Sequence, residues 1–399
     1  MVVLCVVYMC ISFARANYTA SVAYIVGRGI FTKSAAGFIS SSFYVFYSIG
    51  QIVGGRLVDK FMPKRMVTLG IVGAAVTSMM LCFSTNYTYV LIVWTLNGCM
   101  QFGVWPGISR MVAKDLMPQY KEKACLYLSY AVPLGNLISY FLATFLLETY
   151  GWSAMFAVSS IILFATLFFW KKVEKHVSNE RLPKYTGVKI KENIKVYVPF
   201  SKLFLSSGLA FMLIPSFGRC ILRFGMTSWA PTMLMECYQI PSAIASFQSL
   251  ILLVIQMIGL LALAPLMKKI TNPIIGHLVL ASGCIIPLGV LCSVGEISMV
   301  VAFVMLALVL IFANSMFVFM TAYSILFEPL GQTGLVSGII NAIASMGVVF
   351  ANGLFGVLSE QFGWKTVVAV WVIFAILTML FSIIAYFCNK RFWQRISCH

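Results

Sequence analysis

Two strongly apolar stretches of the chain contain arginines, where a charged side chain is unexpected. Arg15 lies in "ISFARANYTA", residues 11–20, and Arg219 and Arg223 lie in "SFGRCILRFGM", residues 216–226. An ionised side chain in nonpolar surroundings costs several kcal/mol unless something compensates it. Because a planar guanidinium binds a phosphate or carboxylate through two parallel hydrogen bonds, Arg15 and Arg223 predict a site for an anion.

An alternative role for Arg15 and Arg223 is to neutralise buried carboxylates. Every acidic residue, however, falls between the apolar runs or near the end of one. None is therefore a partner in the middle of an apolar run. These residues are Asp59, Asp115, Glu122, Glu148, Glu174, Glu180, Glu192, Glu236, Glu296, Glu328 and Glu360. The sequence therefore favours anion binding over structural charge pairing.

The composition indicates what kind of protein positions these arginines. Of the 399 residues, 61% are hydrophobic and 10% are charged, and the mean hydropathy is +0.96. Soluble domains are about half apolar and about one quarter charged. Apolar runs of about 20 residues, the length that crosses a bilayer, recur along the chain. The sequence predicts an all-α membrane protein.

Gly, Pro and charged residues divide the apolar runs into twelve predicted transmembrane helices. The first has no basic segment before it, so we expect a membrane helix and not a cleavable signal peptide. The predicted spans are 3–26, 36–57, 66–84, 88–112, 122–147, 152–171, 207–233, 242–266, 273–293, 298–326, 333–358 and 365–388.

The distribution of basic residues predicts the orientation. The net charge is +17. Most basic residues fall in the connections between spans 2 and 3 and between spans 4 and 5, in residues 171–202, and in the C-terminal tail. Only Arg28, Lys33 and Lys365 fall on the opposite side. By the positive-inside rule, both termini are expected to be cytoplasmic in a multi-pass plasma-membrane protein. This placement argues against nucleic acid as a partner.

The sequence also contains an internal repeat. "LETYGW" and "SEQFGW" share the order Glu, any residue, aromatic, Gly, Trp, and begin their frames at Glu148 and Glu360. Arg15 and Arg223 are separated by nearly the same interval. We expect two pseudo-symmetric six-helix bundles, 1–171 and 207–399, joined by a cytoplasmic linker at 172–206, an arrangement typical of secondary transporters.

A loop motif lies in "GGRLVDKFMPKRM", residues 54–66. It resembles the signature of the major facilitator superfamily, although Met62 replaces the usual glycine. The resemblance implies a conformational latch in which Asp59 accepts hydrogen bonds from a helix N-terminus or an arginine. The alternative is a solvated basic loop that only orients the protein. The matching residues are Gly55, Leu57, Asp59, Lys60, Lys64 and Arg65.

Three further stretches resemble the organophosphate:phosphate antiporters of that superfamily, which carry glycerol 3-phosphate and hexose 6-phosphate. They are "FARANYTASVAYIV", "WTLNGCMQFGVWPGISRMV" and "LRFGMTSWAPTML". The resemblance implies the major facilitator fold, with the substrate phosphate held by Arg15 and Arg223. It further implies secondary active transport of a small organic anion, a phosphorylated metabolite above all, in exchange for inorganic phosphate.

The match to these antiporters is incomplete. Ala16, Gln51 and about Val132 stand where the family commonly has lysine, lysine and histidine. Arg219, one turn before Arg223, either replaces some of the lost charge or only bonds to backbone or reaches the interface. Further candidates for substrate binding are Tyr47, Gln101 and Asn17, each of which has helix–helix contact as its alternative.

The histidines are His176, His277 and His399, and only His277 lies near a predicted span. Exchange is therefore favoured over proton symport. The eleven cysteines show no metal-ligand spacing, and no cofactor, metal site or enzymatic function is expected. The expected partners are a small anionic substrate and membrane lipid, and the protein is expected to be a monomer. Alternative functions are a transporter-like membrane sensor of such anions and a carrier of a carboxylate; an efflux carrier of cations is disfavoured.

Overall fold

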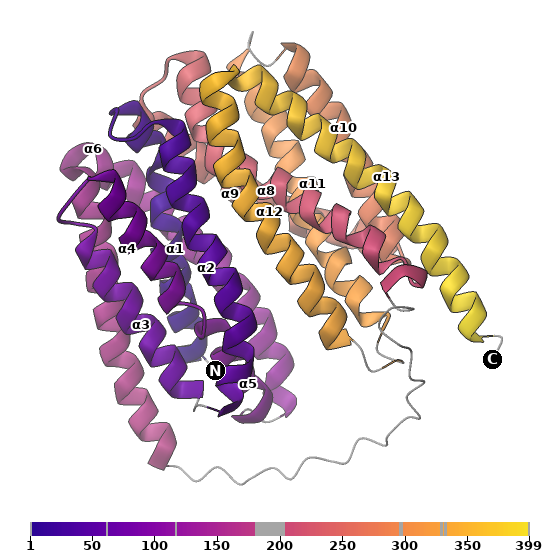
Figure 1. The fold of residues 1–399 in the computed structure, drawn as a ribbon, viewed down its shortest axis with the longest axis horizontal. Coiled ribbons are helices and arrows are strands. Elements are labelled where there is room, and N and C mark those ends of the chain that lie inside the picture. The colour runs from indigo at the N-terminus through magenta and orange to yellow at the C-terminus, as the bar shows by residue number, and fades with distance from the viewer. Residues whose placement is uncertain are drawn as a thin grey trace. The chain divides into compact units, whose positions relative to one another are not determined.

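A computed structural model describes residues 2–60, 63–115, 118–179, 204–294, 298–327, 330 and 333–397. Within these residues the secondary-structure elements longer than one turn are all helices (Figure 1), which confirms the predicted all-α class. Their bounds are α1 (Val2–Gly27), α2 (Lys33–Lys60), α3 (Pro63–Met80), α4 (Tyr87–Met100), α5 (Val104–Asp115), α6 (Pro118–Asn179), α8 (Leu209–Tyr238), α9 (Ser242–Lys268), α10 (Pro273–Val294), α11 (Met299–Ile325), α12 (Thr333–Gln361) and α13 (Gly363–Ser397).

Eight helices in the described part of the chain are long and apolar enough to cross a membrane: α1, α6, α8, α9, α10, α11, α12 and α13. The twelve predicted spans map onto these and onto α2, α3 and the α4–α5 pair. One reason why eight helices stand against twelve predicted spans is that α6 holds two of the spans. Others are that α4 and α5 have only 14 and 12 residues, and that Lys64 and Arg65 lower the mean hydropathy of the 18-residue α3.

The fourth predicted span is divided in the structure. Instead of one helix over 88–112, α4 ends at Met100 and α5 begins at Val104. The Gln101 backbone N–H still donates to the Asn97 carbonyl at 3.3 Å, and the Val104 N–H donates to the Gln101 carbonyl at 3.2 Å. The break therefore places Gln101 at the end of a helix, next to a turn.

Two glycines of the sequence repeat adopt the same unusual backbone conformation. Gly151, within α6, has φ 76°, and Gly363, at the start of α13, has φ 77°. A positive φ is readily available only to glycine. The tryptophan after each glycine donates a 2.8 Å hydrogen bond, Trp152 to the Leu81 carbonyl and Trp364 to Glu236 Oε2. The repeat read from the sequence thus corresponds to a repeated turn.

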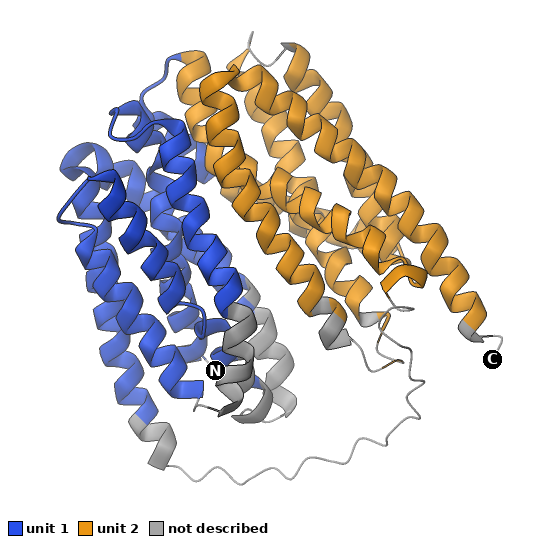
Figure 2. Cartoon of the chain, viewed as in Figure 1, with its two compact units in different colours: residues 1–187, 239–251 blue, residues 188–238, 252–399 orange. Residues whose placement is uncertain are grey.

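The chain forms two compact units, shown in different colours in Figure 2. Unit 1 comprises residues 1–187 and 239–251, and unit 2 comprises residues 188–238 and 252–399. In unit 1, α1 packs along α6; in unit 2, α8 packs on α12 and α13, and α10 packs on α11 and α13. The predicted division at 172–206 stays a prediction, because residues 180–203 of that linker lie outside the described residues.

A close approach of α1 and α6 fixes the helix that carries Arg15. A Cβ atom added at Gly135 of α6 would lie 2.4 Å from the Met9 carbonyl oxygen and 2.8 Å from the Phe13 nitrogen. Only glycine therefore lets the two backbones pack at this distance. The surrounding core of unit 1 is aliphatic and includes Val7 and Ile11, both fully buried.

Candidate anion-binding site

Arg15 lies on α1, partly buried, and is held by an amide from the break between α4 and α5. Its Nε and Nη2 atoms donate to Gln101 Oε1 at 3.3 and 3.2 Å. Gln101 is fully buried, and its Nε2 atom donates to Asn97 Oδ1, one turn earlier on α4. The amide of Gln101 is thereby oriented with its oxygen toward the guanidinium. The structure thus brings together two of the predicted site residues, Arg15 and Gln101.

Aromatic side chains surround the same guanidinium. Its central carbon lies 4.3 Å from the centroid of the Tyr47 ring, a cation–π distance. The side chains of Tyr8 and Tyr44 also lie within electrostatic reach of Arg15. No carboxylate among the described side chains pairs with Arg15. Its contacts to described residues are all with formally neutral groups, which leave its charge available to an anion.

Asn17 has a different environment from Arg15, two residues away. It is fully buried, and its Oδ1 atom accepts a 2.7 Å hydrogen bond from the Ser139 hydroxyl of α6. This contact joins α1 to α6 within the core of unit 1. Its predicted contact with substrate stays a prediction.

The two arginines of α8 also differ from each other. Arg223 is partly buried, with its guanidinium carbon 4.8 Å from the centroid of the neighbouring Phe224 ring. Arg219 is buried, lies 5.3 Å from the Phe317 ring centroid, and its Nη2 atom is 3.1 Å from Cys220 Sγ. Arg15 belongs to unit 1 and the α8 arginines belong to unit 2.

The residues of the predicted latch are described only in part. Gly55, Asp59 and Lys60 lie in the last turns of α2, where the structure describes the helix but no side chains. Lys64 is partly buried and Arg65 is exposed at the start of α3. Met62 lies outside the described residues. The latch stays a prediction.

Sequence reasoning did not select Tyr8, Asn97 or His277. Tyr8 precedes Arg15 by seven residues and Asn97 precedes Gln101 by four, spacings that place each pair on one helix face and could have revealed both. His277 is fully buried on α10, with Nδ1 3.2 Å from Ser382 Oγ of α13. Only the packing of α10 on α13 reveals that contact.

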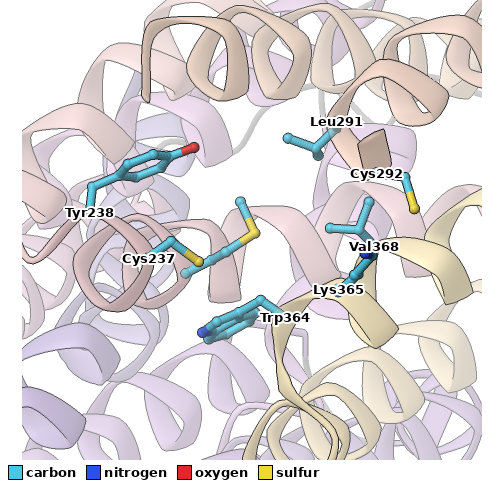
Figure 3. A pocket seen from close by; sticks show the side chains of 8 residues that line it. Cys237, Tyr238, Leu291, Cys292, Trp364, Lys365 and Val368 are labelled. Carbon is cyan, nitrogen blue, oxygen red and sulfur yellow. The ribbon is translucent and has the colours of Figure 1, made fainter. Parts of the chain in front are cut away.

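Unit 2 also has a small pocket of ≈ 20 Å³, open to the surface, near the ends of α8 and α10 and the start of α13 (Figure 3). Its walls are largely apolar and include none of the residues predicted to bind substrate. They are formed by Met233, Cys237, Tyr238, Leu291, Cys292, Trp364, Lys365 and Val368.

Comparison with known families identifies the fold. The family model described as Major Facilitator Superfamily matches residues 4–331. The chain belongs to the Major Facilitator Superfamily. This confirms the resemblance read from residues 54–66, and the long apolar helices make the protein a multi-pass membrane protein of that superfamily.

Curated relatives match parts of this superfamily member at low identity. The membrane sensor protein UhpC of Escherichia coli is 24% identical over 105 residues, 26% of this chain and 24% of the relative. A probable hexose phosphate transport protein of Chlamydia trachomatis is also 24% identical over 105 residues, 26% of this chain and 23% of the relative. The human voltage-gated purine nucleotide uniporter SLC17A9 is 22% identical over 215 residues, 52% of this chain and 49% of the relative. The chain therefore matches between about a quarter and half of the length of these relatives.

Solved structures of the superfamily agree with the fold over the whole chain. A bacterial homologue of the human lysosomal transporter Spinster, in an inward-facing and occupied conformation, superposes with a TM-score of 0.81 at 12% identity, covering 98% of this chain and 97% of that one. A D-xylose–proton symporter gives 0.75 at 15% identity, covering 96% of each chain. At these identities the likeness establishes the fold alone.

Proposed function

We propose that this transporter carries a phosphorylated metabolite across the membrane by alternating access, in exchange for inorganic phosphate. The observation that supports this most is the environment of Arg15. An amide oxygen and tyrosine rings hold the guanidinium, and no described carboxylate neutralises it. A partly buried cation that keeps its charge favours an anionic ligand over a neutral or cationic one.

Arg223 is the second residue that binds the substrate in this proposal. In the proposal, a phosphate dianion accepts paired hydrogen bonds from both guanidinium groups and compensates their charges. Binding therefore lowers the barrier to reorientation, so the loaded carrier moves between its two states and the empty carrier does so slowly. This difference produces exchange. Tyr47 and Gln101 position Arg15, and the predicted latch around Asp59 stabilises one of the two states.

The cellular placement belongs to the same proposal. The excess of Lys and Arg in alternate connections supports cytoplasmic termini, and the plasma membrane is the location in this proposal. The protein acts as a monomer, with membrane lipid and the anion as its partners. The hexose phosphate transport protein among its partial relatives supports a phosphorylated substrate.

A second candidate function is an anion sensor. The partial match to a membrane sensor protein favours it specifically. A sensor would use the same arginines to bind the anion, but it would couple binding to a partner protein and would not move the ligand. A carrier of carboxylates is the remaining alternative, because a carboxylate also accepts a bidentate pair from Arg.

Transport by the purified protein in proteoliposomes tests the proposal. We expect labelled phosphate to enter vesicles preloaded with phosphate and to enter unloaded vesicles much more slowly. Phosphoesters should compete with the label better than carboxylates do. A protonophore should leave the exchange unchanged.

Ligand binding measured in parallel distinguishes the candidates. A phosphoester that raises the Tm of the protein without any exchange would establish the sensor and contradict the carrier. Competition by carboxylates alone would establish the carboxylate carrier. If the folded protein shows no exchange and no Tm shift, that result would contradict anion recognition itself.

A further inference from the structure

One face of α13, the helix that ends at the label C in Figure 1, is exposed along most of its length and changes character near its end. Arg391 and Arg395, both exposed, continue an apolar stripe of this face at the spacing of its members, and exposed Lys390 lies beside them. The members of the stripe are exposed hydrophobic residues that recur every three or four positions, which places them on one side of the helix. They are Ile373, Ile376, Leu380, Ile384 and Phe387.

The opposite face of α13 fixes these last turns against the rest of unit 2. Asn389 is buried, and its Nδ2 atom donates to the Ser207 carbonyl at 2.9 Å. Phe392 lies in a hydrophobic core cluster, and the centroid of the Trp393 ring is 6.2 Å from that of Phe327. The exposed arginines therefore belong to an anchored helix and not to a free tail.

The protein does not balance the charge at this end of α13. Within Gly363–Ser397, α13 contains no Asp or Glu. In the part of the chain that the structure describes, Lys390, Arg391 and Arg395 form no ion pair with a carboxylate. Three positive charges therefore stand together on one exposed helix end, available to an external anion.

The counterpart of α13 in the sequence repeat is different. It is the part of α6 that follows Gly151, and it also has exposed hydrophobic side chains, such as Ile161 and Phe168, before a pair of lysines. There, however, Lys171 Nζ lies 2.8 Å from Glu174 Oε2. The cationic end without an acid thus distinguishes α13 from its counterpart.

The length of α13 places the two parts of its exposed face at different depths in a bilayer. From Ile373 to Phe387 the stripe rises about 21 Å, which is more than half of a hydrocarbon core of about 30 Å. Arg391 and Arg395 lie about 6 and 12 Å beyond Phe387 along the helix axis. They therefore reach the layer of lipid headgroups, where a phosphate accepts paired hydrogen bonds from a guanidinium.

We propose that this face of α13 is a docking site for an anionic phospholipid. The acyl chains lie along the apolar stripe, and the headgroup phosphate accepts hydrogen bonds from Arg391 and Arg395. A zwitterionic lipid carries a cation of its own, which the three basic side chains repel. By the predicted orientation this end of α13 faces the cytoplasm, where the leaflet is negatively charged. The site uses neither Arg15 nor Arg223, so it does not rest on the function proposed above.

Thermal unfolding of the purified full chain in a nonionic detergent tests the site. The probes are phosphatidylglycerol and phosphatidylcholine with the same acyl chains. Binding to the folded state raises Tm, so phosphatidylglycerol should raise the Tm of wild type more than phosphatidylcholine does. The double variant Arg391→Gln, Arg395→Gln should need about thirtyfold more phosphatidylglycerol for the same rise, because each basic residue near an anionic surface strengthens binding about fivefold.

The matched control is the double variant Lys171→Gln, Lys172→Gln, which removes two charges from the counterpart helix. It should respond to both lipids as wild type does. Equal effects of the two lipids on wild type, or an equal loss in this control, would overturn the proposal. If the double variant Arg391→Gln, Arg395→Gln does not fold, Arg391→Gln alone replaces it, with an expected loss of about fivefold.

Inorganic phosphate distinguishes the lipid from a free anion. A rise in Tm caused by phosphate at Arg15 would be equal in wild type and in the variant without Arg391 and Arg395. If phosphate raises the Tm of wild type alone, these arginines bind a free anion and the lipid proposal is wrong. Mass spectrometry of the lipid that copurifies from mixed liposomes gives a readout independent of Tm. Phosphatidylglycerol should be enriched with wild type and not with the variant, and equal enrichment would contradict the site.

Discussion

At the scale of single residues, the central contact is between Arg15 and Gln101. The amide oxygen accepts from two guanidinium nitrogens, and the Gln101 amide is itself oriented by Asn97. An amide fixes the direction of the guanidinium without cancelling its charge. The sequence was sufficient to select Arg15 and Gln101 separately. It could not show that they touch, because their contact depends on the break after Met100.

Replacing Gln101 separates positioning from charge. Gln101→Glu places a carboxylate against Arg15, so we expect anion exchange to be lost. Gln101→Met keeps the volume and the Arg15 charge but removes the acceptor, and KM for the anion should rise about tenfold, the value of one charged hydrogen bond. Exchange kinetics in proteoliposomes measure both. Equal activity of Gln101→Glu and wild type would contradict a substrate role for Arg15.

The contact between Asn17 and Ser139 predicts a structural effect. Asn17→Ala should lower the free energy of unfolding by about 1–3 kcal/mol, because a buried hydrogen bond is lost. Ser139→Ala is the matched control, and the double variant should be only slightly less stable than either single variant. KM for the anion should stay within about twofold of wild type, because the lost hydrogen bond stabilises the fold and does not contribute to substrate binding. A large rise in KM without loss of stability would instead assign Asn17 to the substrate.

At the scale of helices, the repeated turn explains what the sequence could and could not predict. The frame of Glu, any residue, aromatic, Gly and Trp predicted a repeat but no turn, and the structure shows that its glycines, Gly151 and Gly363, have a positive φ, which restricts the residue type. The break between α4 and α5 was missed. Residues 101–103 contain one glycine and no proline inside an apolar run, and glycine occurs within membrane helices as well as at their ends.

The approach of α1 to α6 predicts a sensitive glycine. Gly135→Ala forces a methyl group against the Met9 carbonyl, and we expect a loss of about 1–3 kcal/mol in stability. Gly289 of α10 is the control, because a Cβ there meets nothing within 4 Å. Gly289→Ala should be neutral or stabilising by up to about 1 kcal/mol. Thermal unfolding in detergent compares the two, and equal Tm values would contradict the close packing of α1 on α6.

At the scale of the whole molecule, hydropathy and charge placement were sufficient for the fold class, because a bilayer requires long apolar helices. The composition could not predict how the chain divides into units. Unit 1 includes residues 239–251, the start of α9, where the Ser242 hydroxyl donates to Glu148 on α6. Such a contact joins residues far apart in the chain, and no periodic pattern records it. The environment of His277 was missed for the same reason.

The measurement that tests the central claim most directly is phosphate exchange by Arg15→Lys and Arg223→Lys, with Arg28→Lys as the matched control. Arg28 is exposed outside the membrane helices and pairs with Glu148 at 2.8 Å. Lysine keeps the positive charge but lacks the planar fork. We predict that exchange falls about tenfold to a hundredfold in Arg15→Lys and in Arg223→Lys and stays near wild type in Arg28→Lys. Wild-type exchange in both Arg15→Lys and Arg223→Lys would contradict the account, because neither guanidinium would then hold the transported anion.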